Sequence, residues 1–279
     1  MELPISIVIA VADDTRISKC LDSIDEECEV VVVANGATKE VVDILSTYSE
    51  KMKLKLIELD VRNLSKSRDV GIKAASYNNI ILMDSDCVFL KGTIKRFYEL
   101  IEIKGHKIVN GFIEFKATTV GSKLVKNSRD YLNSISNTGY AFAPCLGLKK
   151  DLVNEIGGYY FDHSIKWVED AELNVRLKKN KILIFDAPEA IIEHCSIPLK
   201  KDLRAAFNYG TGKRIGVRKG IMRGVGAFWS DIPKIFIKKG LFTSIYMICW
   251  NICYTFGYYL QPILKNEEGN KDEKSNMFK

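Results

Sequence analysis

Glu29-Val30-Val31-Val32-Val33-Ala34 is the stretch of sequence that decides the fold. A near-continuous run of valine is typical of a strand that is buried on both faces, as the strands of a parallel sheet are. A second apolar run, Ile5–Val11, precedes it, and Arg16–Ile24 lies between them with apolar residues at helical spacing. Strand, helix and strand in this order predict a right-handed βαβ unit and a parallel sheet.

The same alternation continues up to Met83. We expect helices and strands in turn over the following ranges: Lys39–Glu50, Lys53–Glu58, Ser65–Ala75 and Asn79–Met83. Functional residues of such sheets gather at the carboxyl ends of the strands. In this chain those ends hold Ala12–Asp14, Ala34–Thr38 and Asp84–Asp86.

The second half of the chain alternates less regularly. Extended segments are predicted over Ile108–Lys116, Tyr140–Leu148 and Ile182–Glu193. Helices are predicted over Gly92–Ile103, Leu124–Ile135, Glu169–Lys178 and Lys200–Lys219. We therefore expect an α/β domain over residues 1–199, a basic and apolar helical region over 200–264 and a polar, disordered tail over 265–279.

Composition excludes several classes of protein. Of the 279 residues, 47% are hydrophobic and 27% are charged, which excludes a disordered, collagen-like or coiled-coil chain. The seven cysteines are scattered without a C-x-x-C pair, so a zinc ribbon or a thioredoxin-type site is not expected. The first residues lack a basic segment followed by an apolar run, so we expect no secretory signal and a cytoplasmic protein with reduced thiols.

Positive charge is concentrated in one part of the chain. The net charge is +6, but residues 196–240 alone carry +9 and the rest of the chain −3. Such a local excess points to an anionic partner (phosphates, acidic lipids or nucleic acid), unless it is only a solvated basic face. Directly after it, Gly240–Gln261 carries no charge but includes polar residues. This segment is predicted to lie in a membrane interface, to span a membrane, or to be a buried or dimer-forming helix.

The strongest chemical signal is Asp84-Ser85-Asp86, directly after the apolar run Ile80–Met83. Two carboxylates at the end of a buried strand can share a hard cation with the phosphates of a nucleoside diphosphate. The alternative is a surface turn, since Asp and Ser both favour turns. In this βαβ context we favour the metal site.

Three other positions add to this interpretation. Arg68 lies in the first turn of a predicted helix, where it either binds a phosphate or is an ordinary surface arginine. Asp170 is either a general base for an acceptor hydroxyl or only a partner of the helix dipole. His194 ends an apolar extended run, and it either joins Asp86 at the metal or is structural. Mixed oxygen and nitrogen ligands favour Mn²⁺ over Mg²⁺.

The basic segment 204–214 interleaves Lys and Arg with aromatic residues. It fits either nucleic-acid binding or a flap that closes over a diphosphate with Lys213 and Arg214. We favour the flap and expect no nucleic acid, because the acidic motifs would repel a nucleic-acid backbone.

Taken in order, these segments resemble the family 2 glycosyltransferases with the GT-A fold, over roughly Ile5–Arg214. The resemblance implies a Rossmann-like α/β fold: a mostly parallel central sheet flanked by helices, here followed by a basic, amphipathic helical extension. It implies a nucleotide-binding half over 1–90 and an acceptor-side half over 91–199. The implied activity is metal-dependent, inverting transfer of a sugar from a nucleotide-diphosphate donor to a hydroxyl.

Individual motifs carry the resemblance. Ser67–Ile72 resembles the "ARNxGI" motif, whose arginine contacts the donor, and Asp84-Ser85-Asp86 resembles the DxD motif. Glu169-Asp170 is similar to the "ED" motif, whose Asp is the base of inverting members. Gly147 matches a glycine-containing loop near the donor sugar, and His194 matches a histidine that joins the metal site.

The candidate residues fall into four groups. The catalytic base is Asp170, and the metal ligands are Asp84, Asp86 and His194, for Mn²⁺ or Mg²⁺. The donor-binding residues are Ala10, Asp13, Asn35, Arg68, Asp84, Ser85, Gly147, Lys213 and Arg214. The acceptor-side residues are Trp167, Glu169 and Tyr160, although the two aromatic residues are equally interpretable as packing residues.

The chain departs from the family pattern at the nucleotide. The usual "PxYN" is here Ala10–Asp14, and the usual "DDGSTD" is Ala34–Lys39. The Asp that contacts the base in the family falls at Ala34, so Asn35, Asp13 or Asp14 would have to substitute; UDP is the favoured nucleotide, with the base left open. The Asn of "ARN" is Asp69. No Q-x-x-R-W pattern is present, so a processive synthase is not expected.

The sequence thus predicts a glycosyltransferase of cell-envelope polysaccharide or glycoconjugate synthesis, with a glycan or lipid-linked acceptor. Residues 200–261 would hold it on an anionic membrane surface, at the inner face of the cell membrane, and a homodimer is an alternative use of its apolar helix. The rival interpretations are a nucleotidyltransferase and a catalytically degenerate donor-binding or scaffold subunit. A nucleotidyltransferase would need a glycine-rich, lysine-containing loop after the first strand, where Ala12–Arg16 offers none.

Overall fold

The structure is a computed structural model that describes the backbone of residues 2–136, 139–226 and 228–276 and the side chains within 2–134, 139–226 and 228–261. It divides the chain into two compact units, which are described separately below. The first unit contains residues 1–118 and 129–196, and the second contains 119–128 and 197–279.

The first unit is built on one eight-stranded sheet with the strand order β3-β2-β1-β4-β7-β6-β8-β5. The strands are β1 Ile5–Val11, β2 Glu29–Asn35, β3 Leu54–Leu59, β4 Asn79–Asp84, β5 Cys87–Phe89, β6 Ile108–Phe115, β7 Cys145–Lys149 and β8 Phe185–His194. The first four strands are parallel to one another, as predicted. Beyond β4 the sheet is mixed, because β7 runs antiparallel to both of its neighbours and β5 runs antiparallel to β8.

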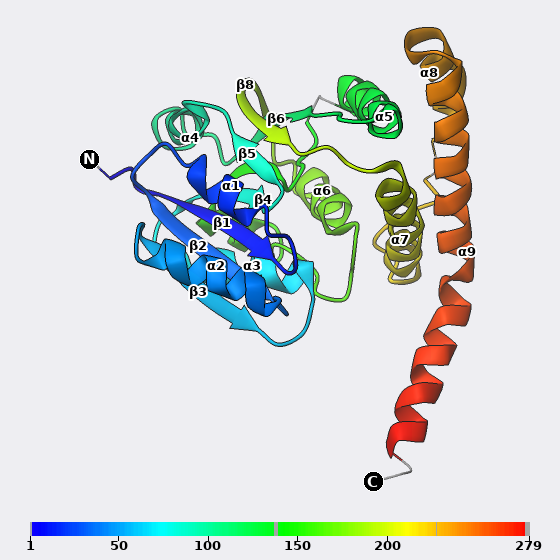
Figure 1. Cartoon of the computed structure of the whole chain (residues 1–279), viewed down its shortest axis with the longest axis horizontal. Coiled ribbons are helices and arrows are strands. Elements are labelled where there is room, and N and C mark those ends of the chain that lie inside the picture. Colours follow the sequence, from blue (N-terminus) through cyan, green and yellow to red (C-terminus); the bar gives the residue numbers. More distant parts are fainter. Residues whose placement is uncertain (1, 137–138, 227, 277–279) are drawn as a thin grey trace. The chain divides into compact units, whose positions relative to one another are not determined.

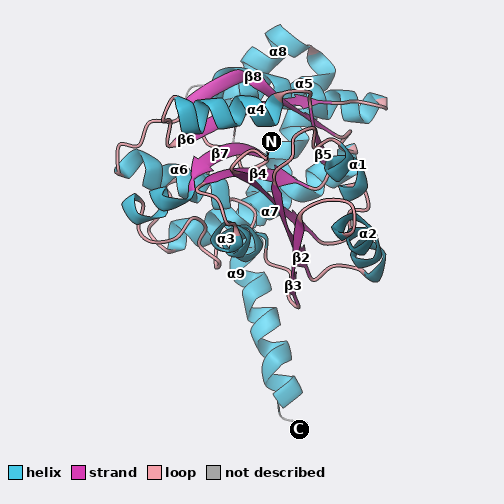
Figure 2. Ribbon diagram, turned by 90° about the vertical axis from the view of Figure 1, so that its left-hand side faces the viewer, coloured by secondary structure: helices cyan, strands magenta, loops and turns pink. Residues whose placement is uncertain are grey.

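Helices cover both faces of this sheet (Figures 1 and 2). They are α1 Ile17–Asp22, α2 Lys39–Ser49, α3 Leu64–Ala74, α4 Thr93–Tyr98 with a π-helical continuation Glu99–Ile103, and α6 Glu169–Lys179, besides a 3-10 segment Lys150–Glu155. Figure 2 shows α2 and α3 on opposite sides of β2 and β3. The helix α3 packs closely because residue 71 is glycine: a Cβ there would lie 2.4 Å from Cγ1 of Val8.

The register of the strands determines which side chains meet at the carboxyl edge. Ala10 at the end of β1 pairs with Val33 on one side and with Asp84 on the other. On the next strand pair, Ala34 lies beside Glu58. The edge therefore runs continuously from the predicted metal-binding motif to the outermost strand.

The strand predicted over Tyr140–Leu148 is shorter than expected. Only Cys145–Lys149 forms β7, because the preceding backbone bonds to side chains instead of to a strand. The amide of Ala141 donates to Asn174 Oδ1 at 2.8 Å, and the amide of Phe142 donates to Asn110 Oδ1 at 3.1 Å.

The second unit is helical. Its elements are the first part of α5 Val120–Ser136, then α7 Leu199–Arg218, a 3-10 turn Trp229–Asp231, α8 Ile232–Lys239 and α9 Leu241–Asn276. The backbones of α7 and α9 approach closely at two glycines: a Cβ on Gly210 or Gly257 would lie 2.0 Å or 1.9 Å from a carbonyl oxygen of the other helix. The predicted tail, 265–279, lies outside the described side chains, and the backbone of α9 continues to Asn276.

The helix α9 has an unusual distribution of side chains. Its polar residues Thr243, Ser244 and Asn251 are buried, whereas large apolar residues face outward. The outward residues are Leu241, Phe242, Ile245, Ile248, Ile252, Phe256, Tyr259 and Leu260, which we call the outer face of α9. Among the described residues, no helix is both long and apolar enough to cross a membrane.

Candidate active site

The predicted metal ligands Asp86 and His194 lie together at the carboxyl edge of the sheet. Asp86 follows β4 and His194 ends β8, and the pairing of Cys87 with His194 in the β5–β8 ladder holds the two segments side by side. Nε2 of His194 lies 3.6 Å from Oδ1 of Asp86. The ligand atoms of Asp86, Cys87 and His194 all lie within 4.8 Å of one another.

The histidine ring is held in the form that a metal ligand needs. Nδ1 of His194 lies 2.8 Å from the carbonyl oxygen of Cys195, and a carbonyl can only accept, so Nδ1 carries the proton. The lone pair of Nε2 is then directed to the side where Asp86 lies. The ring stacks on Phe115 with the centroids 5.2 Å apart. The donor set of carboxylate oxygen and imidazole nitrogen fits a divalent cation such as Mn²⁺.

Arg68 links the DxD segment to the start of α6. Nη2 donates to Oδ1 of Asp84 at 2.6 Å, and Nη1 donates to Oε1 of Glu169 at 2.5 Å. The side chains of Arg68 and Glu169 are each only 5% exposed, so this pair is buried. Burial acts to lower the pKa of Arg68, but Asp84 and Glu169 outweigh it and the pKa is raised further. The guanidinium is therefore permanently charged and fixes two carboxylates.

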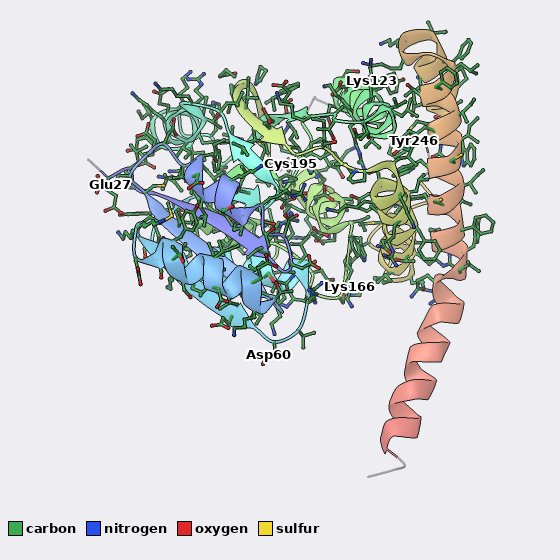
Figure 3. The ribbon with its side chains drawn as sticks, viewed as in Figure 1. Glu27, Asp60, Lys123, Lys166, Cys195 and Tyr246 are labelled. Carbon is green, nitrogen blue, oxygen red and sulfur yellow. The ribbon has the colours of Figure 1, made fainter. Side chains whose placement is uncertain are left out.

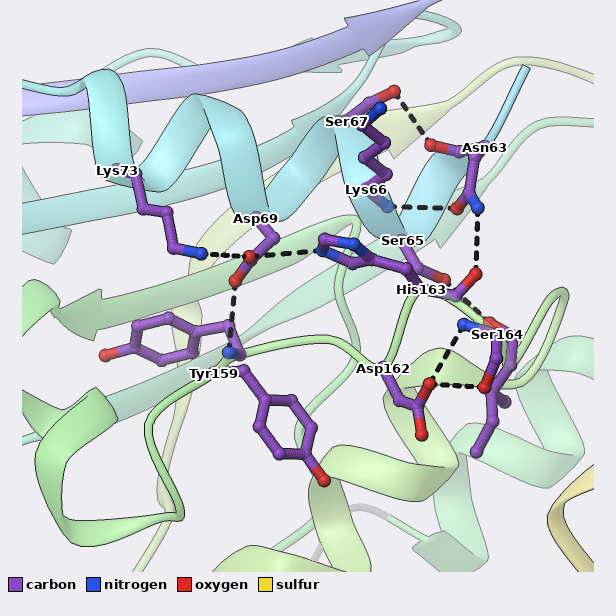
Figure 4. Close-up of polar contacts among 12 residues, drawn as sticks. Asn63, Ser65, Lys66, Ser67, Asp69, Lys73, Tyr159, Asp162, His163 and Ser164 are labelled. Atoms are coloured by element: carbon purple, nitrogen blue, oxygen red, sulfur yellow. Dashed lines mark hydrogen bonds and ion pairs between the residues drawn. The ribbon is translucent and has the colours of Figure 1, made fainter. Parts of the chain in front are cut away.

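A set of hydrogen bonds holds α3 against the loop that leads to α6 (Figure 4). Asn63 caps α3 by accepting from the amide of Lys66, and its Nδ2 donates to the carbonyl of His163 at 2.8 Å. The hydroxyl of Ser65 donates to the carbonyl of Ile165 at 2.7 Å. Asp69, which replaces the Asn of the family motif, is buried and accepts from the amide of Tyr160 at 3.2 Å. These bonds hold α3 beside the loop before α6, and so keep Arg68 within hydrogen-bonding distance of Glu169.

Asp170, the predicted base, is half-buried beside this pair. Burial is the main cause that raises its pKa to about 7, and the neighbouring Glu169 adds to the effect. Arg68 and the amide of Ala171, which donates to Oδ1 at 2.7 Å, act in the opposite direction. A carboxyl group that titrates near neutral pH is suited to accept a proton during a reaction.

Arg16 is a functional candidate that sequence reasoning missed. Its Nη2 lies 3.2 Å from Oδ2 of Asp86, and Nε donates to Oδ1 of Asp14 at 2.7 Å. The available signal was the charged segment Asp13–Arg16 at the end of β1, which faces the end of β4 because the two strands are neighbours.

The sequence matches the model of one protein family over more than half of its length. Residues 6–157 match the model "Glycosyl transferase family 2". The chain belongs to glycosyl transferase family 2. The match includes Arg68 and the DxD segment but ends before Glu169 and His194. No curated protein matches the glycosyltransferase by sequence.

Solved structures resemble the glycosyltransferase along most of its length. One is the mannosyltransferase PcManGT from Pyrobaculum calidifontis in complex with GDP-Man and Mn²⁺, with a TM-score of 0.61 and 15% identity; the match covers 92% of this chain and 73% of that one. Another is S. aureus TarS 1-349 in complex with UDP-GlcNAc, with a TM-score of 0.56, 18% identity and coverage of 88% and 79%. The predicted GT-A fold and the predicted class of enzyme are thereby confirmed.

Two residues that were predicted to contact ligands are buried in the glycosyltransferase. Gly147 is buried inside β7, not in a loop, and is glycine because a Cβ would lie 2.6 Å from the ring of Phe97. Tyr160 is 2% exposed, and its hydroxyl donates to the carbonyl of Lys149 at 2.5 Å, so it is a packing residue that has no face for a sugar. Gly147 was assigned from the family resemblance and Tyr160 from its local segment, and neither source reveals burial.

The other predicted nucleotide contacts lie along the carboxyl edge. Ala10 and Ser85 are half-buried at the ends of β1 and β4. Asp13 is exposed and forms an ion pair with Arg62 at 3.0 Å. Asn35 is buried, and its Oδ1 accepts from the amide of Asn63 at 2.7 Å, so that oxygen positions the start of α3.

Trp167 and the basic pair remain predictions. Trp167 is 47% exposed, and its φ of 71° is a conformation that bulky residues rarely adopt. Lys213 and Arg214 lie on α7 of the second unit. Burial lowers the pKa of Lys213, and Arg214 stacks on Tyr258 with its guanidinium 5.0 Å from the ring centroid.

Proposed function

We propose that this glycosyltransferase is metal-dependent and inverting, and that it transfers a sugar from a nucleotide-diphosphate donor to a hydroxyl of a glycan or lipid-linked acceptor. The observation that carries the proposal is the grouping of Asp86, His194 and Asp84 at one edge, with Arg68 and Glu169 connecting that edge to Asp170. The Mn²⁺ and the nucleotide sugars named in the two structural neighbours support the same kind of donor site.

The residues present would hold the cation through Asp86 and His194, with Asp84 adjacent. When bound, the cation would neutralise charge that develops on the departing diphosphate. Arg68 holds Asp84 in place, since its guanidinium is already hydrogen-bonded to that carboxylate. Preorganised charge of this kind requires no rearrangement at the moment of reaction.

Asp170 is the group that would accept the proton of the acceptor hydroxyl. As the hydroxyl oxygen bonds to C1 of the sugar, the bond between C1 and the phosphate oxygen breaks, and its electron pair leaves with the nucleoside diphosphate. Attack from the face opposite the leaving group inverts the configuration at C1. Among the residues that the structure describes, Oε2 of Glu169 is buried without a hydrogen-bond partner, so this carboxylate is held by Arg68 through its other oxygen alone.

The experiment that tests this proposal is binding of nucleoside diphosphates by calorimetry, with and without Mn²⁺, in the wild type and in Asp84→Ala/Asp86→Ala. Metal-dependent binding that the double variant loses is the expected result. Absence of any binding by folded wild-type protein would contradict the donor site and favour a scaffold subunit.

We also propose that the outer face of α9 rests on an anionic membrane surface, at the inner face of the cell membrane. Phe236 and Ile237 on α8 are 54% and 82% exposed, and lysines 234, 238 and 239 lie on the same short helix. An apolar helix face with adjacent lysines is typical of interfacial binding to acidic lipids. Flotation with anionic liposomes tests it: Ile245→Asp/Ile252→Asp should stay at the bottom of the gradient, and self-association without flotation would favour a homodimer.

A further inference from the structure

A cavity of about 280 Å³ opens at the carboxyl ends of β2 and β3. Three of its lining residues are very small, namely Ala34, Gly36 and Ala37. Glu58 and Asp60 supply carboxylates. Asp60 lies at the surface beyond the end of β3 (Figure 3). Gly36 has a φ of 57°, so a larger residue there would be strained as well as obstructive.

The position of this cavity suits the base of a bound nucleotide. In the strand order β3-β2-β1-β4, two strands separate β3 from β4, which carries Asp84. Neighbouring strands are about 4.8 Å apart, so a nucleotide whose diphosphate lies at β4 would extend over β1 to the cavity. The position of the diphosphate at β4 is that of the proposed function, on which this inference rests.

The carboxylates of this cavity come from β3 and the residue after Leu59, not from β2. The family motif that Ala34–Lys39 resembles has an Asp at the position of Ala34, where this chain has none. The register partner of Ala34 on β3 is Glu58. Within the part of the chain that the structure describes, neither Glu58 nor Asp60 has a side-chain hydrogen bond or an ion pair. Both carboxylates are therefore free to bind a ligand.

The chemistry of a carboxylate selects among the bases. An ionised carboxylate only accepts hydrogen bonds, and its two oxygens suit two parallel donors. Guanine offers two adjacent donors, N1–H and the N2 amino group. Uracil offers a single N–H between two carbonyls, and cytosine and adenine each place an acceptor nitrogen beside the amino group. A purine edge also reaches farther from the ribose than a pyrimidine edge, which matches a carboxylate moved outward by one strand.

We propose that Glu58 binds the N1–H and N2 amino edge of guanine, so that the donor is a GDP-sugar. This assignment replaces the expectation of UDP that the sequence alone favoured. Ala34 and Ala37 leave space for the purine, and Asp60 adds negative potential next to the donor edge.

The test is calorimetric titration of the full chain with GDP, UDP, CDP, ADP and inosine diphosphate, each with Mn²⁺. GDP is expected to bind at least about tenfold more tightly than UDP, CDP or ADP, because a site built to accept hydrogen bonds rejects ligands that lack the donors. Inosine diphosphate keeps N1–H but lacks the N2 amino group, so it should fall between GDP and the others. Equal or tighter binding of UDP, CDP or ADP would overturn the assignment.

Two variants complete the test. Glu58→Gln replaces one acceptor oxygen by a donor and should bring the affinity for GDP to within about threefold of that for UDP. The matched control is Glu50→Gln, because Glu50 is an exposed glutamate at the end of α2, outside the cavity, and should leave every affinity unchanged. If the Glu58→Gln variant keeps the preference for GDP over UDP, the proposed role of Glu58 is wrong. If no nucleotide binds folded wild-type protein with Mn²⁺, the proposed function itself fails, which is a different result from binding without a preference for guanine.

Discussion

The two ends of one sheet edge differ in how their charges are used. At β4, Arg68 is hydrogen-bonded to Asp84 and Glu169, and two of these three side chains are almost fully buried. At β2 and β3, Glu58 and Asp60 are exposed and have no partner in the described part of the chain. At the β4 end, where we propose that the reaction takes place, the charged side chains are already paired with one another. At the β2 and β3 end, where we propose that the base binds, the two carboxylates are left for a ligand.

Loss of both DxD carboxylates should have the largest effect. Asp84→Ala/Asp86→Ala removes the proposed cation ligand and the carboxylate that Arg68 orients, so we expect transfer to fall by more than about 10⁴-fold. Steady-state transfer assays with added Mn²⁺ measure it, and circular dichroism checks the fold. Chelation of the cation in the wild type should reproduce the loss. Added Mn²⁺ should then restore the activity of the wild type but not that of the double variant. Residual transfer above about one tenth would contradict a metal site at this end.

Asp170→Asn should lower kcat by about 10²–10⁴-fold, the usual contribution of a general base. Because the side chain keeps its shape, the affinity for the nucleoside diphosphate should not change. Asp151→Asn, an exposed aspartate in the 3-10 segment after β7, is the matched control and should retain full activity. If Asp170→Asn weakens nucleotide binding and leaves kcat unchanged, Asp170 belongs to the donor site instead.

Arg68→Met should destabilise the first unit by about 3–5 kcal/mol, because two carboxylates, one of them buried, lose their shared cation. Urea denaturation followed by circular dichroism gives the free energy of unfolding. A loss below about 1 kcal/mol would show that Glu169 and Asp84 find other partners. The Arg68→Met variant therefore tests the β4 end of the sheet edge, where the charges are paired and buried.

The pH dependence of transfer follows from the raised pKa of Asp170, about 7. A base must be ionised, so kcat should fall about tenfold per pH unit below that value and level off above it. The free energy of unfolding should instead decrease as the pH rises, because burial favours the protonated form of Asp170 in the folded state. The penalty for ionised Asp170 is absent below its ordinary pKa, grows as the pH rises and is complete above about 7. Asp170→Asn should therefore be more stable than the wild type at pH 8 and equally stable at pH 3, as measured by urea denaturation.

The parts of the fold that sequence predicted well are those with local patterns. The valine run predicted as Glu29–Ala34 is β2 Glu29–Asn35, and the helix predicted as Glu169–Lys178 is α6 Glu169–Lys179. Both depend on the periodicity of neighbouring residues. The helix α8, Ile232–Lys239, lies within the region 200–264 that was predicted to be helical, but it was not predicted as a separate helix, because eight residues with a proline near their start give little periodicity.

The sequence predicted individual residues of the candidate site but not the contacts between residues that are far apart in the chain. Arg16 meets Asp86 seventy positions away, and nothing local to either residue indicates that pairing. The expected role of Arg68 as a donor contact did not include Glu169, which lies one hundred and one positions away. The same limit explains Gly147, because its close neighbour Phe97 comes from α4.

Arg62→Met should have the smallest effect and so completes the comparison. Arg62 pairs with Asp13 at 3.0 Å, but the two side chains are 53% and 64% exposed, so water already solvates both charges. Surface pairs of this kind contribute about 0–1 kcal/mol, and we expect the free energy of unfolding to change by no more than that. The loss should also shrink further in high salt, whereas the loss in Arg68→Met should persist, since buried pairs are poorly screened. If Arg62→Met destabilises the protein as much as Arg68→Met does, then burial does not determine how much these ion pairs contribute to stability.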